Sequence, residues 1–198
     1  MSNVQSDAML VHRCINGDTD AYGELVTRYQ KAVYATAYYY VGRFGSAEDV
    51  SQDALLAAYK SLPNLKKPDR FASWLKEVTC RTASNWLRQH GKTINLETPL
   101  PYKRTISIED ARANPEHVFR KQDRVEMIQR AIDTLPERFR LPVILRYLQE
   151  LSYQEISHFT GESPDEVRGI LQRALSQLKE ILVEDDEQSQ GEQDWRRV

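Results

Sequence analysis

The segment SYQEISHFTGESPDEV, residues 152–167, decides how the chain folds. It holds two capping boxes, Ser152-Tyr153-Gln154-Glu155 and Ser163-Pro164-Asp165-Glu166, in which a serine and a glutamate three residues later satisfy the free N–H groups of a helix start. A proline at the first helical position supports the second start, and Gly161 between the boxes favours a tight turn. The segment therefore predicts a short helix, a turn and a longer helix, the arrangement of a helix-turn-helix.

Helical spacing of apolar residues also dominates the rest of the chain, and no segment shows the alternation of a strand. The N-terminal half predicts helices over 7–15, from 18 to about 40, from 46 to 62 and from 68 to 90, separated by Asn16-Gly17, Phe44-Gly45 and Pro63. We expect Ser46 to cap the third of these helices. We also expect Pro142 to kink the helix over 136–148 or to shorten it.

The periodicity fades between the two helical parts and again at the C-terminus. Residues 93–117 contain three prolines and mixed charge, which is typical of a linker. Residues 183–198 are rich in acidic and amide side chains, which favours disorder. The sequence thus predicts an all-α chain of two small helical domains, 1–92 and 118–182, joined by an irregular linker and followed by an acidic, disordered tail.

Composition excludes several classes of protein. The 198 residues are 40% hydrophobic, enough for a core, yet no apolar run approaches the ~20 residues of a membrane span. The N-terminus lacks the pattern of a secretory signal, so we expect a cytoplasmic protein without membrane insertion. The two cysteines, Cys14 and Cys80, are then free thiols. The scattered histidines and the absence of catalytic motifs predict no metal, no cofactor and no enzymatic activity.

Charge is distributed unevenly. The net charge is only −2, but residues 66–92 carry seven Lys or Arg against two acidic residues. A local basic patch in an acidic chain is typical of a polyanion-binding surface.

Two separated stretches resemble one family in the right order. Residues 47–55 (AEDVSQDAL) with 71–75 (FASWL) resemble region 2 of the extracytoplasmic-function sigma factors. Residues 135–138 (LPER), 145–147 (LRY) and 151–156 (LSYQEI) resemble their region 4. The resemblance implies a transcription initiation factor that binds core RNA polymerase through the β′ coiled coil and the β flap. It also implies binding to promoter DNA and regulation by an anti-sigma factor.

The resemblance assigns polymerase binding to the helix over 46–62. The exposed contacts would be acidic and amide side chains: Glu48, Asp49, Gln52 and Asp53. Such groups suit a basic partner because charge complementarity guides encounter and orientation. The same residues would equally serve a solvated helix start whose dipole favours anions.

The resemblance assigns the opening of the minus-ten promoter element to the helix over 68–90. At about 100° per residue, Arg81, Asn85 and Arg88 share one face, with Trp74 at its edge. Cations and an aromatic ring suit single-stranded DNA, and the nearby Lys66 and Lys67 can help to hold a flipped base. For Trp74, packing in the core is an equally good interpretation.

The minus-thirty-five element would be read by the second helix of the helix-turn-helix. Its candidate contacts are Ser163, Asp165, Arg168, Gln172 and Arg173. The helix carries as many acidic as basic residues, whereas the family usually has more Lys and Arg where this chain has Leu175, Ser176 and Gln177. An alternative function is therefore a sigma-like interaction protein that binds polymerase or an anti-sigma factor with little promoter recognition.

Overall fold

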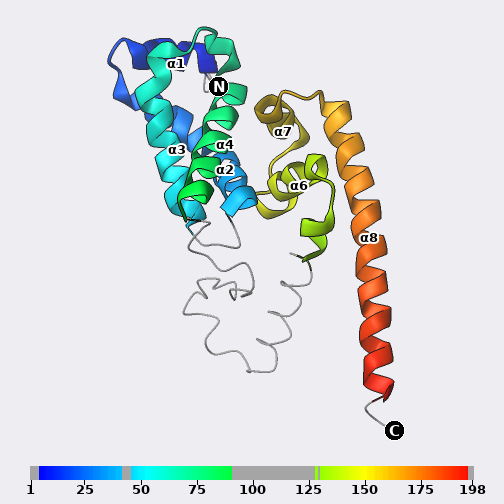
Figure 1. The fold of residues 1–198 in the computed structure, drawn as a ribbon. Helices are drawn as coiled ribbons and strands as arrows, with labels where there is room; N and C mark the ends of the chain where they lie inside the picture. Colours follow the sequence, from blue (N-terminus) through cyan, green and yellow to red (C-terminus); the bar gives the residue numbers. More distant parts are fainter. Residues whose placement is uncertain (1–4, 42–45, 91–127, 129, 196–198) are drawn as a thin grey trace, which may run out of the picture. The chain divides into compact units, whose positions relative to one another are not determined.

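The computed structural model describes residues 5–41, 46–90, 128 and 130–195, and for 183–195 it describes the backbone alone. All regular elements in these ranges are helical, which confirms the predicted all-α class. Figure 1 shows them in chain order. The elements are α1 Asp7–Ile15, α2 Thr19–Val41, α3 Ala47–Ser61, η1 Leu62–Asn64, η2 Pro68–Arg70, α4 Phe71–His90, α6 Glu137–Val143, η4 Ile144–Leu148, α7 Tyr153–Thr160 and α8 Pro164–Trp195.

The chain divides into two compact units. The first comprises Met1–Pro99 with Leu141–Arg168, and the second comprises Leu100–Arg140 with Gly169–Val198. The predicted linker over 93–117 lies outside the described residues. None of the helices in the described part of the chain is long and apolar enough to cross a membrane.

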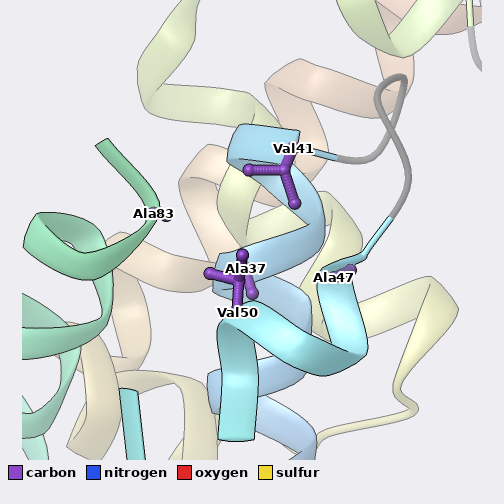
Figure 2. Packing of buried hydrophobic residues seen from close by; sticks show 5 residues of the cluster. All are labelled: Ala37, Val41, Ala47, Val50 and Ala83. Atoms are coloured by element: carbon purple, nitrogen blue, oxygen red, sulfur yellow. The ribbon is translucent and has the colours of Figure 1, made fainter. Parts of the chain in front are cut away.

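Small side chains let the helices of the first unit approach closely. Helix α2 packs against both α3 and α4, and these two also pack against each other. Figure 2 shows one cluster at this junction, in which Ala37 and Val41 of α2 meet Ala47 and Val50 of α3 and Ala83 of α4. Each of these residues is at most 7% exposed. Burial of such apolar surface stabilises the bundle by about 25 cal/mol per Å².

A buried carboxylate joins α1 to α2. Asp7, only 8% exposed, accepts hydrogen bonds from the hydroxyl of Tyr29 and from the guanidinium of Arg28. His158 of α7, in the same unit, places its Nε2 3.0 Å from an oxygen of this carboxylate group. Burial, followed by the bond to Asp7, raises the pKa of Tyr29, so its hydroxyl keeps its proton and donates.

The helix-turn-helix has the local structure that its sequence predicts. The Ser152 and Glu155 capping box is formed, with the Ser152 N–H donating to Glu155 at 2.7 Å. Gly161 ends α7 with a φ of 84°, a left-handed conformation that glycine adopts at little cost. Ser163 and Glu166 form the second box, because the Ser163 N–H donates to Glu166 and the Glu166 N–H donates to the Ser163 hydroxyl.

Two helix ends differ from expectation. Ser46 does precede α3, but its φ of 20° and ψ of 35° turn its side chain away from capping, and it makes no cap hydrogen bond. Helix α8 continues to Trp195 instead of ending near Leu182. Residues 183–195 contain no proline and many Glu and Gln, which are good helix formers, so the existing helix adds turns without a new nucleus.

Pro142 neither ends nor starts a helix. Helix α6 runs across it to Val143 and is followed by η4, a π-helical turn in which the Gln149 N–H donates to the Ile144 carbonyl at 3.3 Å. A proline cannot donate to the preceding turn, and its ring crowds a carbonyl there. A wider turn directly after the proline is one way to keep the helix going despite that loss.

Candidate functional site

Helix α3 separates its buried and exposed residues cleanly. Ala47, Val50, Ser51, Ala54 and Ala58 face the bundle and are buried. The four residues predicted to bind polymerase all lie exposed on the opposite side: Glu48, Asp49, Gln52 and Asp53. None of them is needed for the core, so this face is available to a partner.

Two apolar side chains extend this face and were missed by the sequence analysis. Leu56 is 51% exposed and Tyr59 is 40% exposed, and both follow Gln52 at helical spacing. They line an open, mostly apolar depression with Thr19, Tyr22 and Leu55. The Tyr22 hydroxyl donates to the Leu55 carbonyl at 2.5 Å, which fixes the floor of this depression. The signal was present in the sequence, because Leu56 and Tyr59 do not fit the buried face of α3.

The basic face of α4 is exposed as predicted. Arg81, Asn85 and Arg88 are all exposed on one side of the helix, and the Arg88 guanidinium donates to the Asn85 side-chain carbonyl. Lys66 and Lys67 are also exposed, in the turn between η1 and η2. The structure therefore leaves these cations accessible to a polyanion.

The sequence left two interpretations open for Trp74, DNA contact and core packing, and its position agrees in part with each. It is half-buried, and its ring centroid lies 5.9 Å from that of the buried Phe71. One part of the ring therefore packs on the core and another part is accessible.

A second aromatic surface at the end of α4 was not predicted. The Trp86 ring stacks on His90 with centroids 4.5 Å apart and planes inclined by 20°. The His90 Nδ1 lies 3.0 Å from the Trp86 carbonyl, which holds the stack against the helix. The spacing of four residues was the signal, since such residues are neighbours on a helix surface.

Lys76, another basic residue of the patch, is also engaged within the protein. Lys76 donates from Nζ to the Thr160 carbonyl at the end of α7, at 3.1 Å. This bond satisfies a carbonyl that a helix end would otherwise leave free.

All five predicted promoter-reading residues at the start of α8 are exposed, and both arginines among them contact groups of the same helix. Arg168 pairs with Asp165 at 2.9 Å, and Arg173 donates from Nε to the Gly169 carbonyl at 3.0 Å. Gln172 is exposed, while Ser163 is used in the cap. Hydrogen bonds from the Ser163 backbone and hydroxyl lower the pKa of Glu166, so this cap stays charged at neutral pH.

Among the described residues, no group of His, Cys, Asp or Glu is arranged to hold a metal ion. The arrangement is one of separate exposed faces: an acidic and apolar face on α3, a basic and aromatic face on α4, and a mixed polar face on α8. Exposed faces of this kind are available for contact with other macromolecules.

Comparison with known proteins decides the family. The model of sigma-70 region 2 matches residues 25–93, and that of sigma-70 region 4 matches residues 125–178. The ECF RNA polymerase sigma-E factor of Escherichia coli K12 is 32% identical over 165 residues, covering 79% of this chain and 84% of that protein. The chain belongs to the ECF sigma factors of RNA polymerase. Like its family, this sigma factor directs RNA polymerase to promoters and is not an enzyme.

One further relative and one solved structure are similar to this sigma factor. The ECF sigma factor SigE of Mycolicibacterium smegmatis is 31% identical over 163 residues, covering 82% of this chain and 62% of that protein. The solved structure of CnrH with the cytosolic domain of CnrY has a TM-score of 0.57 at 22% identity, covering 91% of this chain and 99% of the matched chain. At that identity the likeness shows a shared fold.

Proposed function

We propose that this sigma factor divides promoter recruitment among three faces: α3 binds the β′ coiled coil, α4 opens the minus-ten element and α8 reads the minus-thirty-five element. The observation that carries the proposal is the separation on α3, where the buried side consists of small residues and the exposed side carries three acidic residues, Glu48, Asp49 and Asp53, beside Leu56. The protein acts in the cytoplasm, where core polymerase is found. The β flap and an anti-sigma factor are further proposed partners.

The chemistry of α3 suits a helical, basic partner. Stable interfaces combine an apolar centre with a polar rim. Leu56 and Tyr59 supply the apolar part, and Asp49 and Asp53 supply charge that steers encounter and fixes orientation.

Charge reversal on α3 tests this contact. Asp49→Arg with Asp53→Arg should weaken binding to core polymerase about tenfold or more, because attraction becomes repulsion on an exposed face. The matched control is Asp20→Arg with Glu24→Arg, which makes the same change in net charge on exposed residues of α2. Affinity is measured by titration of labelled protein with core, and helicity by circular dichroism. Equal affinity of the two double variants would remove α3 as the polymerase contact.

The face of α4 suits unpaired DNA. Arg81 and Arg88 offer charge to phosphates, and the accessible part of Trp74 offers a ring on which a base can stack. Capture of bases as they unpair stabilises the open strand, so strand opening follows from binding without a chemical step.

Salt dependence tests the role of α4. Arg81→Ala with Arg88→Ala should lower the salt slope of minus-ten single-strand binding by about two, one for each phosphate that is no longer neutralised. Binding is measured with the holoenzyme at several salt concentrations. Lys60→Ala with Lys179→Ala removes two exposed cations elsewhere and serves as the control. An unchanged slope in the Arg81 and Arg88 variant would place that face away from the DNA.

The contacts of two arginines within α8 favour a weaker role for this helix in promoter recognition. Its central arginine, Arg168, is paired with Asp165, and Arg173 is bonded to the backbone. In free α8 both arginines of this face are therefore engaged in contacts within the helix, and polymerase would supply the high local concentration that makes a weak DNA contact effective. The second candidate function, a sigma-like interaction protein with little upstream recognition, rests on this observation. Transcription from matched and mismatched upstream elements with Arg168→Ala separates the two candidates.

A further inference from the structure

A glycine stands in α8 where nothing in the fold requires one. Gly169 lies in regular helix, and its φ is not in the left-handed region, unlike that of Gly161. A Cβ built on Gly169 would meet only the Arg173 guanidinium, at 3.6 Å, which is an ordinary van der Waals distance. Glycine is among the weakest helix formers because it loses the most backbone freedom. Alanine would therefore give a better helix at this position without any clash.

Gly169 lies on the polar side of α8. At about 100° per residue it falls inside the sector bounded by Arg168 and Arg173, with Gln172 between them. The opposite side is buried through Val167, Ile170, Leu171 and Ala174. The bare backbone of Gly169 is therefore set among the side chains assigned to promoter contact.

We propose that Gly169 is a specificity-determining residue of promoter recognition, because its missing side chain lets α8 seat closely against the edge of duplex DNA. This inference rests on the proposed role of α8. A methyl group at Gly169 would hold the helix away from the duplex by roughly the length of a carbon–carbon bond. Hydrogen bonds of about 2.9 Å from Arg168 and Gln172 would then exceed bonding distance.

The flanking chemistry favours DNA as the occupant of this surface. Arginine and glutamine read base edges in the major groove, and arginine also binds phosphate. Asp165 is exposed, and so is its ion pair with Arg168. Such pairs are weak in solvent, so Arg168 can leave Asp165 when a nucleic acid arrives. Arg173 already reaches across the glycine, and the 3.6 Å contact shows that alanine would leave its position unchanged. A defect of Gly169→Ala would therefore come from the approach of the partner.

The chain offers a matched control. Gly23 is also a glycine inside an α-helix, α2, and a Cβ there would meet nothing within 4 Å. Gly23→Ala therefore changes helix propensity in the same direction without touching the polar side of α8.

The experiment uses the full chain with core polymerase. Promoters are selected with the wild-type holoenzyme from a randomised library, and transcription is measured on templates with the upstream element intact or scrambled. We expect Gly169→Ala to unfold at the same or a higher temperature than the wild type, and to lose roughly fivefold or more of the intact-to-scrambled ratio, the discrimination of one base contact. Gly23→Ala should keep the wild-type ratio.

Three outcomes overturn the inference. If Arg168→Ala loses upstream discrimination and Gly169→Ala keeps it, the glycine has no role while the proposed function of α8 stands. If neither variant changes the ratio, α8 does not read the upstream element, and both proposals fail. If Gly169→Ala reduces core binding and transcribes both templates equally less, the glycine is a contact with protein.

Discussion

Removal of the Asp7 carboxylate should destabilise the first unit by about 2–3 kcal/mol, and most of this loss should depend on Tyr29. Tyr29 is 4% exposed, so Asp7→Ala leaves its buried hydroxyl without this acceptor, at a cost of about 1–3 kcal/mol. The ion pair with Arg28, whose side chain is 31% exposed, adds only about 0.2–1 kcal/mol because water screens it.

The double-mutant cycle with Tyr29→Phe isolates the hydroxyl. In the Tyr29→Phe background, Asp7→Ala should cost about 1 kcal/mol, since only the bonds from Arg28 and His158 remain to be removed. The four free energies of unfolding are measured by urea titration followed by circular dichroism. A coupling of about 1–2 kcal/mol is expected. Additivity within about 0.5 kcal/mol would refute the reasoning, because the hydroxyl would then not depend on the carboxylate.

Further predictions concern the helix-turn-helix. Bonds from Ser152 lower the pKa of Glu155 below its ordinary value of 4.5, so the cap stabilises the fold above that pH and the contribution is lost as pH falls through the lowered value. The stability difference between wild type and Glu155→Gln should accordingly shrink in urea titrations as the pH falls from neutral to below the lowered pKa of Glu155, and a constant difference would contradict it. Gly161→Ala should cost about 1–2 kcal/mol because φ is 84° there, and Gly161→Asn should cost less in the same assay.

Local signals in the sequence were sufficient to predict the helix-turn-helix. A capping box needs only a serine and a glutamate three residues apart, and both boxes formed where the spacing predicted them. Ser46 shows the limit of such signals. A cap needs extended backbone at the capping residue, and Ser46 does not have it. Its residue type alone could not reveal this.

Long-range contacts lay beyond local patterns. Asp7 and Tyr29 are separated by 22 residues, and only the fold brings them together. Leu56 and Tyr59 fall off the buried face of α3, so their exposure could have been read from the helical spacing of that helix, but the sequence analysis considered only its acidic and amide residues. For the assigned contacts, the structure establishes exposure of Asp49, Arg81 and their neighbours, while their partners remain predictions.

The separation of buried from exposed residues on α3 has a consequence for how its sequence can change. Its packing depends on Ala47, Val50, Ala54 and Ala58, whereas its outward polar residues, Glu48, Asp49, Gln52 and Asp53, are exposed. Surface substitutions away from buried features usually change stability by less than about 0.5 kcal/mol. Substitutions of these outward residues can therefore change the affinity of α3 for a partner without unfolding the protein. Binding and folding can be altered separately on one helix.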